Sequence, residues 1–263
     1  MTPTPDNTPG ETLISSSLIV HLLELRRRLL QWVATLLVMF FILFPFQNRV
    51  FEFVALPMIK RLPAGSSMIA TGVVSPFMTP MKLVLIVALF LSMPVFLYHL
   101  WRFISPALYK NERRMFLPLL VSSVLLFYSG VAFAYFVLFP VAFAFLTAAA
   151  PAGVKVMTDI NAYLDFVLTI FFAFGLAFEV PVAIVLVVWA GFTTPGKLGK
   201  LRPYALVGAF IVGMILSPPD VVSMTLLSVP IYLLYEIGML MARVLVPGSK
   251  QVDAQREQGQ AEP

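Results

Sequence analysis

Residues 83–101, LVLIVALFLSMPVFLYHLW, form an apolar run that contains no Asp, Glu, Lys or Arg. A bilayer core about 30 Å thick needs about 20 apolar residues in one helix, so this run is long enough to cross a membrane. Of the 263 residues, 60% are hydrophobic and 12% are charged, whereas soluble domains carry about 25% charged residues. The sequence therefore predicts an integral membrane protein.

Six largely apolar intervals occur along the chain, and two of them each contain one glutamate. They are Leu29–Asn48, Leu83–Trp101, Met115–Val154, Phe166–Leu198, Pro203–Pro219 and Val221–Ala242. The runs lack the alternation that a membrane β-strand requires, so each is predicted to hold one helix. The third interval is too long for one span, but it contains TAAAPAGV, a small-residue and proline stretch typical of a loop.

The predicted fold is an all-α integral membrane protein with six transmembrane helices in one domain, residues 18–243. The helices are expected at about 24–46, 78–101, 115–140, 163–189, 203–216 and 222–240. The polar segments 1–17 and 244–263 are predicted to be disordered tails. Cysteine is absent, which excludes disulfides and thiolate metal sites.

The distribution of positive charge predicts the orientation of these helices. Thirteen of the 18 Lys and Arg residues fall on the side of the N-terminus, and five fall on the opposite side. Cytoplasmic loops carry the excess of Lys and Arg, so both termini are expected in the cytoplasm. The net charge of +5 then reflects loops that face anionic lipid, and nucleic-acid binding is not expected.

Two features predict the shape of the bundle. The fifth span, 203–216, is only about 21 Å long at 1.5 Å per residue, so the fifth and sixth helices are expected to thin the bilayer locally. Prolines recur inside the spans, and each interior proline removes a hydrogen bond and bends its helix. These prolines are Pro45, Pro94, Pro118, Pro140, Pro181 and Pro230. A kinked, concave bundle is therefore favoured over a straight one.

Two glutamates lie among arginines on the N-terminal side of the membrane. Glu24 lies in HLLELRRRLL, where a salt bridge to Arg27 or Arg28 would explain it as part of an amphipathic entry to the first span. Glu112 lies in the loop ALYKNERR, where it would interact favourably with the dipole of the third helix. The arginines keep both carboxylates ionised, so a binding role remains open as the alternative.

Glu179 differs because it lies inside a predicted span, where a charge costs at least about 2.5 kcal/mol. Residues of this kind are usually functional, and we predict an intramembrane polar site here. Pro181 deprives the carbonyl of Ala177 of its helix partner, which favours a polar pocket. The alternative is a glutamate satisfied by a neighbouring helix. Asp220, at the end of SPPD, is predicted to cap the sixth helix.

Several long motifs resemble a known family when taken together and in order. They are HLLELRRRLL, IATGVVSPFMTPMKL, FISPALYKNERR, FAYFVLFPVAFAFL, FAFGLAFEVPVAIVL and RPYALVGAFIVGMILSPPD. From about Ser17 to Arg243 the chain resembles the TatC subunit of the bacterial twin-arginine protein translocase. The resemblance implies a glove-shaped receptor in the inner membrane that binds signal peptides carrying two consecutive arginines. It also implies that TatB, TatA and further TatC copies are partners, and that the proton motive force drives export of folded proteins.

The resemblance also assigns a signal-peptide site. That site comprises Glu24, Phe103 and Glu112 with the neighbouring Arg26, Arg113 and Arg114. Guanidinium binds carboxylate through paired hydrogen bonds that a lysine ammonium cannot reproduce. Adjacent arginines of an extended peptide point in opposite directions, so they need two acceptors on separate elements. The apolar part of the signal is expected to insert along the concave wall and to approach Glu179.

In the same family the single helix of TatB or TatA docks on the short fifth and sixth helices, at positions that match about Met214, Ser217 and Met224. Some relatives have an amide where this chain has Met224, which puts a hydrogen-bonded contact there in doubt, although the flexible methionine can still pack a partner helix. Pro57 and Asp220 match outer-face positions that are associated with assembly.

Two other classes of function compete with this interpretation. A secondary carrier would also use buried acids and kinked helices, but the chain shows no internal repeat and its fifth and sixth spans are thin. An intramembrane hydrolase would need HExxH, GxSxG or a pair of buried aspartates, none of which occurs. The nucleotide-binding pattern GxxxxGK[ST] is also absent. The sequence therefore predicts a protein that is not an enzyme, with no catalytic residue, metal or cofactor.

Overall fold

The computed structural model of the chain describes residues 9–60, 67–104, 113–148, 157–217 and 220–246. The side chains of residues 9–22, 103–104 and 113–116 lie outside this description. Most described residues are helical. The elements are α1 (Pro9–Leu43), a 3₁₀ turn (Phe44–Phe46), α2 (Gln47–Ile59), β1 (Met68–Ile69), α3 (Ser75–Ile104), α4 (Arg113–Phe133), a π-helical turn (Ala134–Leu138), α5 (Phe139–Ala148), β2 (Thr158–Asp159), α6 (Ile160–Ala177), α7 (Val180–Trp189), α8 (Pro195–Lys200), α9 (Arg202–Leu216) and α10 (Val221–Leu245).

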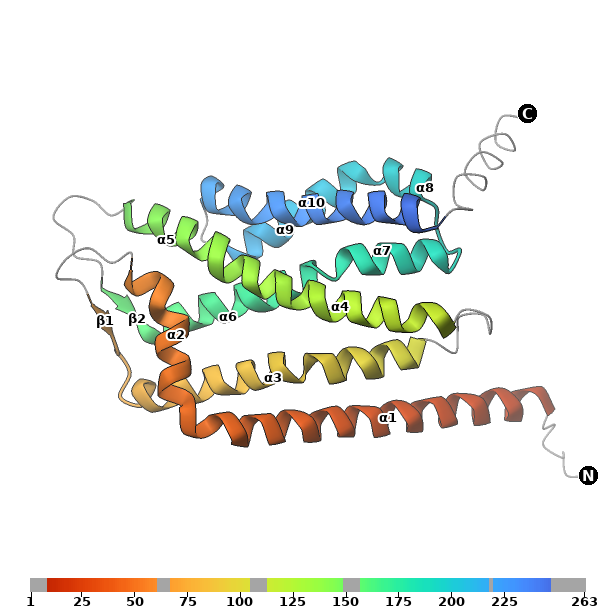
Figure 1. Ribbon diagram of the computed structural model, residues 1–263, viewed down its shortest axis with the longest axis horizontal. Helices are drawn as coiled ribbons and strands as arrows, with labels where there is room; N and C mark the ends of the chain where they lie inside the picture. The colour runs from red at the N-terminus through yellow and green to blue at the C-terminus, as the bar shows by residue number, and fades with distance from the viewer. Residues whose placement is uncertain (1–8, 61–66, 105–112, 149–156, 218–219, 247–263) are drawn as a thin grey trace, which may run out of the picture.

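The long helices run side by side, and neighbours in space are not always neighbours in sequence (Figure 1). α1 packs along α3, α4 packs against α6, and α10 packs against both α7 and α9. The start of α1, the end of α3, the start of α4 and the end of α10 share one end of the bundle, which we call the termini end (Figure 1). The strands and α2 occupy the opposite end, which we call the strand end.

Five described segments are long and apolar enough to cross a membrane. They are Leu23–Ile59, Ser75–Arg102, Leu117–Ala148, Ile160–Trp189 and Val221–Leu245. α9 adds a sixth apolar helix that is shorter, at 15 residues. The predicted all-α membrane fold is thereby confirmed, and so is the short fifth helix.

Prolines shape the helices in two ways. Pro45 lies in the 3₁₀ turn after α1, and α2 then runs across the strand end instead of continuing α1 (Figure 1). Pro140 lies just after the π-helical turn. A proline offers no N–H to the carbonyl four residues back, which explains why the helix is irregular there. By contrast, Pro94, Pro118 and Pro230 lie within continuous helices.

Three helices, α1, α2 and α8, differ from those that the apolar intervals predict. α1 begins at Pro9, within the segment for which the sequence predicts a disordered tail, and proline is favoured at the first position of a helix. The hydropathy of the sequence does not mark α2 and α8 as separate helices, because α2 begins within the first apolar interval and α8 has only six residues.

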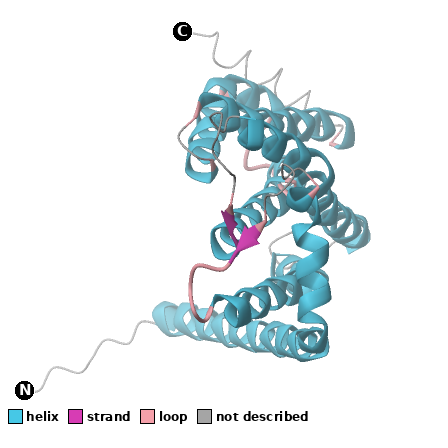
Figure 2. Cartoon of the chain, turned by 90° about the vertical axis from the view of Figure 1, so that its left-hand side faces the viewer, coloured by secondary structure: helices cyan, strands magenta, loops and turns pink. Residues whose placement is uncertain are grey.

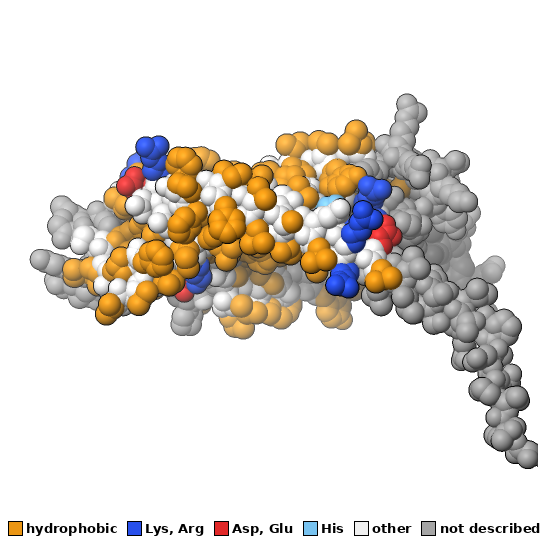
Figure 3. Space-filling model, turned by 90° about the horizontal axis from the view of Figure 1, so that it is seen from below, with side chains coloured by type: hydrophobic (Ala, Val, Ile, Leu, Met, Phe, Trp, Pro, Cys, Tyr) orange, Lys and Arg blue, Asp and Glu red, His pale blue; other side chains and the backbone are white. Residues whose placement is uncertain are grey.

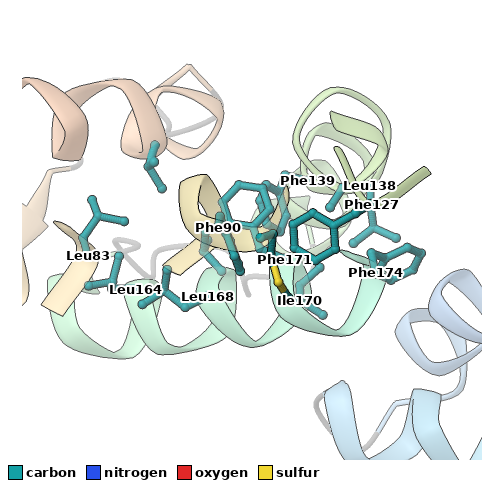
Figure 4. Close-up of a cluster of buried hydrophobic side chains, with 14 of the residues drawn as sticks. Leu83, Phe90, Phe127, Leu138, Phe139, Leu164, Leu168, Ile170, Phe171 and Phe174 are labelled. Atoms are coloured by element: carbon teal, nitrogen blue, oxygen red, sulfur yellow. The ribbon is translucent and has the colours of Figure 1, made fainter. Parts of the chain in front are cut away.

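Aromatic side chains fill the centre of the bundle (Figure 4). Phe90 of α3 meets Phe127 of α4 edge to face, with ring centroids 5.7 Å apart, and Phe171 of α6 meets Phe139 of α5 at 5.0 Å. Such pairs add about 0.5–1.5 kcal/mol beyond burial. Gly130 of α4 lies where a Cβ would come within 2.4 Å of the Phe174 carbonyl oxygen, so only glycine permits this close approach of α4 to α6.

Polar side chains join two loops at the strand end. β1 and β2 pair in parallel, with Met68 opposite Thr158 (Figure 2). The Asp159 carboxylate accepts hydrogen bonds from the backbone N–H of Thr71 at 3.0 Å and from the Thr71 hydroxyl. These bonds hold the pKa of Asp159 down at about 2, because they favour its charged form. The segment before α3 is thereby fixed to the start of α6.

A second group of polar contacts continues this network along α3 and α6. The Thr79 hydroxyl donates to Asn161, whose amide donates to Ser75, and Lys82 pairs with Asp165. The two helices are therefore joined at the strand end by several side chains.

Candidate functional site

Glu24 lies in the exposed part of α1 at the termini end. Its Oε1 accepts a hydrogen bond from the guanidinium of Arg28, one turn further along the helix. This pair is one of the two salt bridges that the sequence suggests. The Glu24 side chain is half-exposed, and its Oε2 has no hydrogen-bond partner among the described residues. A carboxylate in this state can accept a further donor from outside the protein.

Arg28 is deeply buried for a charged residue, with only 9% of its surface exposed. It lies in a cleft between α1 and α3 together with Trp32 of α1 and His99 of α3. Trp32 is itself fixed to α3, because its indole N–H donates to Ser92 at 3.0 Å. The partner of Glu24 is therefore held by the packing of two helices, which fixes the position of the carboxylate.

Basic side chains, one acidic side chain and a histidine gather on one face at the termini end (Figure 3). Arg26, however, lies about 160° around α1 from Glu24 at 3.6 residues per turn. It lines a separate shallow hollow with Arg27, Leu30 and Gln31. The structure therefore does not bring Arg26 next to the Glu24 carboxylate.

The rest of the predicted signal-peptide site is only partly described. Glu112 lies outside the described residues. Phe103 is in the last turn of α3, and Arg113 and Arg114 begin α4, but the side chains of all three lie outside the description. α3 ends and α4 begins at the same end of the bundle as Glu24 (Figure 1).

Glu179 occupies a break between α6 and α7. α6 ends at Ala177, and α7 resumes at Val180 with Pro181 in its first turn. The proline explains the break, because it leaves the Ala177 carbonyl without a donor, as the sequence predicts. Figure 1 shows this junction near the middle of the bundle.

Two neighbouring helices hold the Glu179 carboxylate. The Ser123 hydroxyl of α4 donates to Glu179 Oε2, and the indole N–H of Trp101 on α3 donates to Ser123 Oγ at 3.2 Å. Glu179 Oε1 is buried and has no partner among the described residues. Among the described residues, no Lys, Arg or His forms a salt bridge with this carboxylate. The result is a buried acid held by a hydroxyl, with one oxygen still able to accept a hydrogen bond.

The apolar pattern does not predict the roles of Ser123 and Trp101. Ser123 is a polar residue in an apolar run, which is a weak signal, and Trp101 has the position of an interface residue. Both are buried in the structure. Their link to Glu179 joins three helices, and only the packing of those helices brings the residues together.

The predicted docking residues lie at the strand end of α9 and α10. Met214 is 59% exposed, whereas the Ser217 hydroxyl is buried without a partner among the described residues. The Met224 carbonyl accepts from the Ser228 hydroxyl at 2.7 Å. Gly213 packs here so closely that a Cβ would lie 2.1 Å from Ser228 Oγ. The two helices therefore form one tightly packed hairpin.

The two predicted outer-face residues have clear local roles. Pro57 is buried within α2. Asp220 is the N-cap of α10, where its carboxylate accepts from the Ser223 N–H at 2.6 Å, so the predicted cap is confirmed. In the described ranges no three His, Asp or Glu side chains lie close enough together to hold a metal ion.

The chain matches known proteins over most of its length. Residues 20–230 match the family model described as Sec-independent protein translocase protein (TatC). A TatC protein of Escherichia coli K12 is 59% identical over 229 residues, which cover 87% of this chain and 89% of that protein. A TatC protein of Haemophilus influenzae is 53% identical over 233 residues, which cover 89% and 91%.

A solved structure gives the same result for the fold. The crystal structure of a twin-arginine translocase receptor TatC is 37% identical, with a TM-score of 0.76, over 84% of this chain and 99% of that one. The fold and these matches define a helical membrane component of a protein translocase, which is a transport protein and not an enzyme. The chain belongs to the TatC family.

Proposed function

We propose that the chain is the signal-peptide receptor of a twin-arginine translocase in a bacterial inner membrane, with both termini in the cytoplasm. The observation that carries this proposal is the Glu24 carboxylate, which Arg28 holds through one oxygen while the other has no partner among the described residues. Membership of the TatC family supports it, and so does the description of a similar solved structure as a translocase receptor.

Glu24 is suited to receive one arginine of a signal peptide. A hydrogen bond between charged groups contributes about 1.5–3 kcal/mol, and a guanidinium can offer two parallel N–H groups. Because Arg28 is buried between α1 and α3, little side-chain freedom of Glu24 is left to lose when the peptide binds. We assign the second arginine to Glu112, which the chain places between α3 and α4.

The apolar part of the signal then inserts toward Glu179. In this proposal the Ser123 hydroxyl orients the carboxylate, and the open Oε1 accepts a donor from the inserted segment or from a partner helix. A buried acceptor without a donor costs free energy, so a donor that arrives there is favoured.

TatB and TatA dock on α9 and α10 in this proposal. The exposed Met214 offers flexible apolar contact, and the buried Ser217 hydroxyl offers a hydrogen bond to a partner helix. Energy for export comes from the proton motive force, since a membrane potential supplies about 2.3 kcal/mol per charge per 100 mV.

Photo-cross-linking of a signal peptide to the full chain in membrane vesicles tests the receptor function. Peptides with an arginine pair and with a lysine pair are compared on the unaltered chain, on Glu24→Gln, on Glu112→Gln and on the double variant. We expect the arginine-pair adduct to weaken in each single variant and to disappear in the double variant.

Glu52→Gln is the matched control, because Glu52 is an exposed glutamate on α2 at the other end of the bundle. It should leave the adduct unchanged. If the lysine-pair peptide binds as well as the arginine-pair peptide, or if the double variant still binds, the proposed receptor site is wrong.

A further inference from the structure

The cleft between α1 and α3 has a mixed lining. Its volume is about 70 Å³, and its walls are mostly apolar. The lining side chains are Leu25, Leu29, Trp32, Phe96 and Leu100, with Arg28 and His99 as the two polar members. Leu25, Leu29 and Leu100 are each between 39% and 50% exposed. The cleft therefore opens on the outer surface of the helix pair, beside apolar side chains that face the bilayer.

Arg28 does not use all of its hydrogen-bond donors. One terminal nitrogen donates to Glu24. The other, Nη1, is buried and has no partner among the described residues. A guanidinium carries five N–H donors, and a buried charged donor without an acceptor costs more free energy than a neutral one. The described part of the chain thus contains a buried cationic donor that lacks an acceptor.

The surrounding charges favour an anion as that acceptor. The positive charges of Arg28 and Arg102 both act on His99, so the three groups lie close together at the end of α3. Glu24 is the one acidic side chain with a salt bridge to this group among the described residues, and one carboxylate does not balance two guanidinium groups.

The position of the cleft along the helices points to a lipid as the source of the anion. The charge-free run of α1 begins at Leu29, directly after Arg28, and that of α3 ends at Trp101, directly before Arg102. Arg28 and His99 therefore lie at the edges of these runs, within about one turn of the membrane surface. Phospholipid phosphates lie at that depth, and basic pockets between membrane helices bind anionic head groups. Trp32 adds an aromatic ring of the kind enriched at this interface.

We infer that the cleft is a binding site for one anionic phospholipid, whose phosphate accepts from Arg28 Nη1 and whose first methylenes lie on Leu25, Leu29 and Phe96. Leu29 and Leu100 turn aside to admit the phosphate. Both side chains are partly exposed, and exposed side chains change rotamer within nanoseconds, so this movement is fast. A free phosphate ion would gain the charge contact but not the apolar contact, and the lipid therefore binds more tightly.

Native mass spectrometry of the full chain, released from detergent after incubation with phosphatidylglycerol, tests this site. We expect the chain to retain one phosphatidylglycerol more tightly than any further lipid. Arg28→Gln should weaken that retention by about tenfold or more, because it removes the charged donor. Arg27→Gln, which removes a neighbouring arginine that does not line the cleft, is the matched control and should retain the lipid.

Glu24→Gln separates binding from a general effect on folding. It removes the carboxylate that competes for Arg28, so retention of phosphatidylglycerol should increase. A purely structural role of Arg28 would instead predict a decrease or no change. Because no signal peptide is present, the result does not depend on the proposed receptor function.

Two further probes identify the ligand chemistry. Phosphatidylcholine should be retained no better by the unaltered chain than by Arg28→Gln, and an excess of inorganic phosphate should fail to displace phosphatidylglycerol. Equal retention of phosphatidylglycerol by the unaltered chain and Arg28→Gln would overturn the site. Displacement by inorganic phosphate would overturn the lipid as its occupant.

Discussion

Two carboxylates at the strand end and one at the termini end of the bundle use their oxygens in different ways. At the strand end, Asp159 accepts four hydrogen bonds, two of them from Thr71 in another loop, and Asp220 caps its own helix. At the termini end, Glu24 uses one oxygen and Arg28 leaves a buried nitrogen without an acceptor, as far as the described residues show. The carboxylates of Asp159 and Asp220 are therefore satisfied within the chain, whereas the Glu24–Arg28 pair retains capacity for an outside partner.

This difference separates residues that hold the fold from residues that are available for recognition. A carboxylate whose acceptor sites are filled by its own chain contributes to stability, and its loss should be seen in unfolding. A carboxylate that is held in position but has one oxygen without a partner contributes to binding. Its removal should weaken binding more than it lowers stability. The predictions that follow, from the largest expected effect to the smallest, test this separation.

Charge reversal of Glu24 should have the largest effect. Glu24→Arg replaces an acceptor by a cation, so the affinity for an arginine-pair peptide should fall by about a hundredfold or more, because a charge-assisted hydrogen bond of about 1.5–3 kcal/mol is lost and repulsion is added. Fluorescence anisotropy of a labelled peptide measures the affinity. Glu52→Arg, at the strand end, should bind normally, and a similar loss in that variant would show that net charge and not position matters.

Gly213→Ala should destabilise the hairpin of α9 and α10. The new Cβ would lie 2.1 Å from Ser228 Oγ and 2.9 Å from the Met224 carbonyl oxygen, and overpacking of this kind costs about 1–3 kcal/mol. Gly208→Ala on the same helix is the control, because a Cβ there meets nothing within 4 Å. Unfolding in detergent is the measurement, and equal stability of the two variants would contradict the packing.

Removal of the Glu179 contacts should slow transport without weakening the first binding step. We expect Glu179→Ala to lower the export rate of a folded precursor about tenfold, which corresponds to the loss of one buried hydrogen bond. Ser123→Ala should act in the same direction but less strongly. Export by membrane vesicles and peptide cross-linking are measured together, and a fully active Glu179→Ala would remove this residue from the mechanism.

Asp220→Ala should reduce stability by about 1 kcal/mol, the usual effect of losing an N-cap. Asp220→Ser keeps an oxygen that can accept from the Ser223 N–H, so it should recover most of the loss. Thermal unfolding in detergent provides the measurement. If the serine variant is as unstable as the alanine variant, the role of Asp220 is not that of a cap.

The smallest effect concerns pH at the strand end. The pKa of Asp159 is lowered from 3.8 to about 2, so its hydrogen bonds to Thr71 stabilise the folded state above about pH 4 and are lost as the pH falls through about 2. Between pH 7 and pH 4 no change is expected. Hydrogen exchange at the Thr71 amide measures this, and Asp159→Asn should remove the additional loss of protection at low pH.

Local signals in the sequence were sufficient for several parts of the structure. The apolar intervals predicted the helical membrane fold, because a charge-free run of this length has no other stable state in a bilayer. Pro181 predicted a bend and a lost hydrogen bond at Ala177, where the structure has a full break between α6 and α7, and Asp220 predicted the cap of α10. Both effects act within one turn of the chain. The salt bridge of Glu24 was predicted as a pair with Arg27 or Arg28 for the same reason.

Other features depend on contacts between distant segments. The sequence alone determined the spans, the short fifth helix and the positions of the acidic residues, because hydropathy and helix periodicity are local properties. Only the tertiary structure buried Arg28 against α3 and linked Trp101 through Ser123 to Glu179. Those relations depend on which helices pack together, and packing is decided by the shapes of side chains that lie far apart in the sequence.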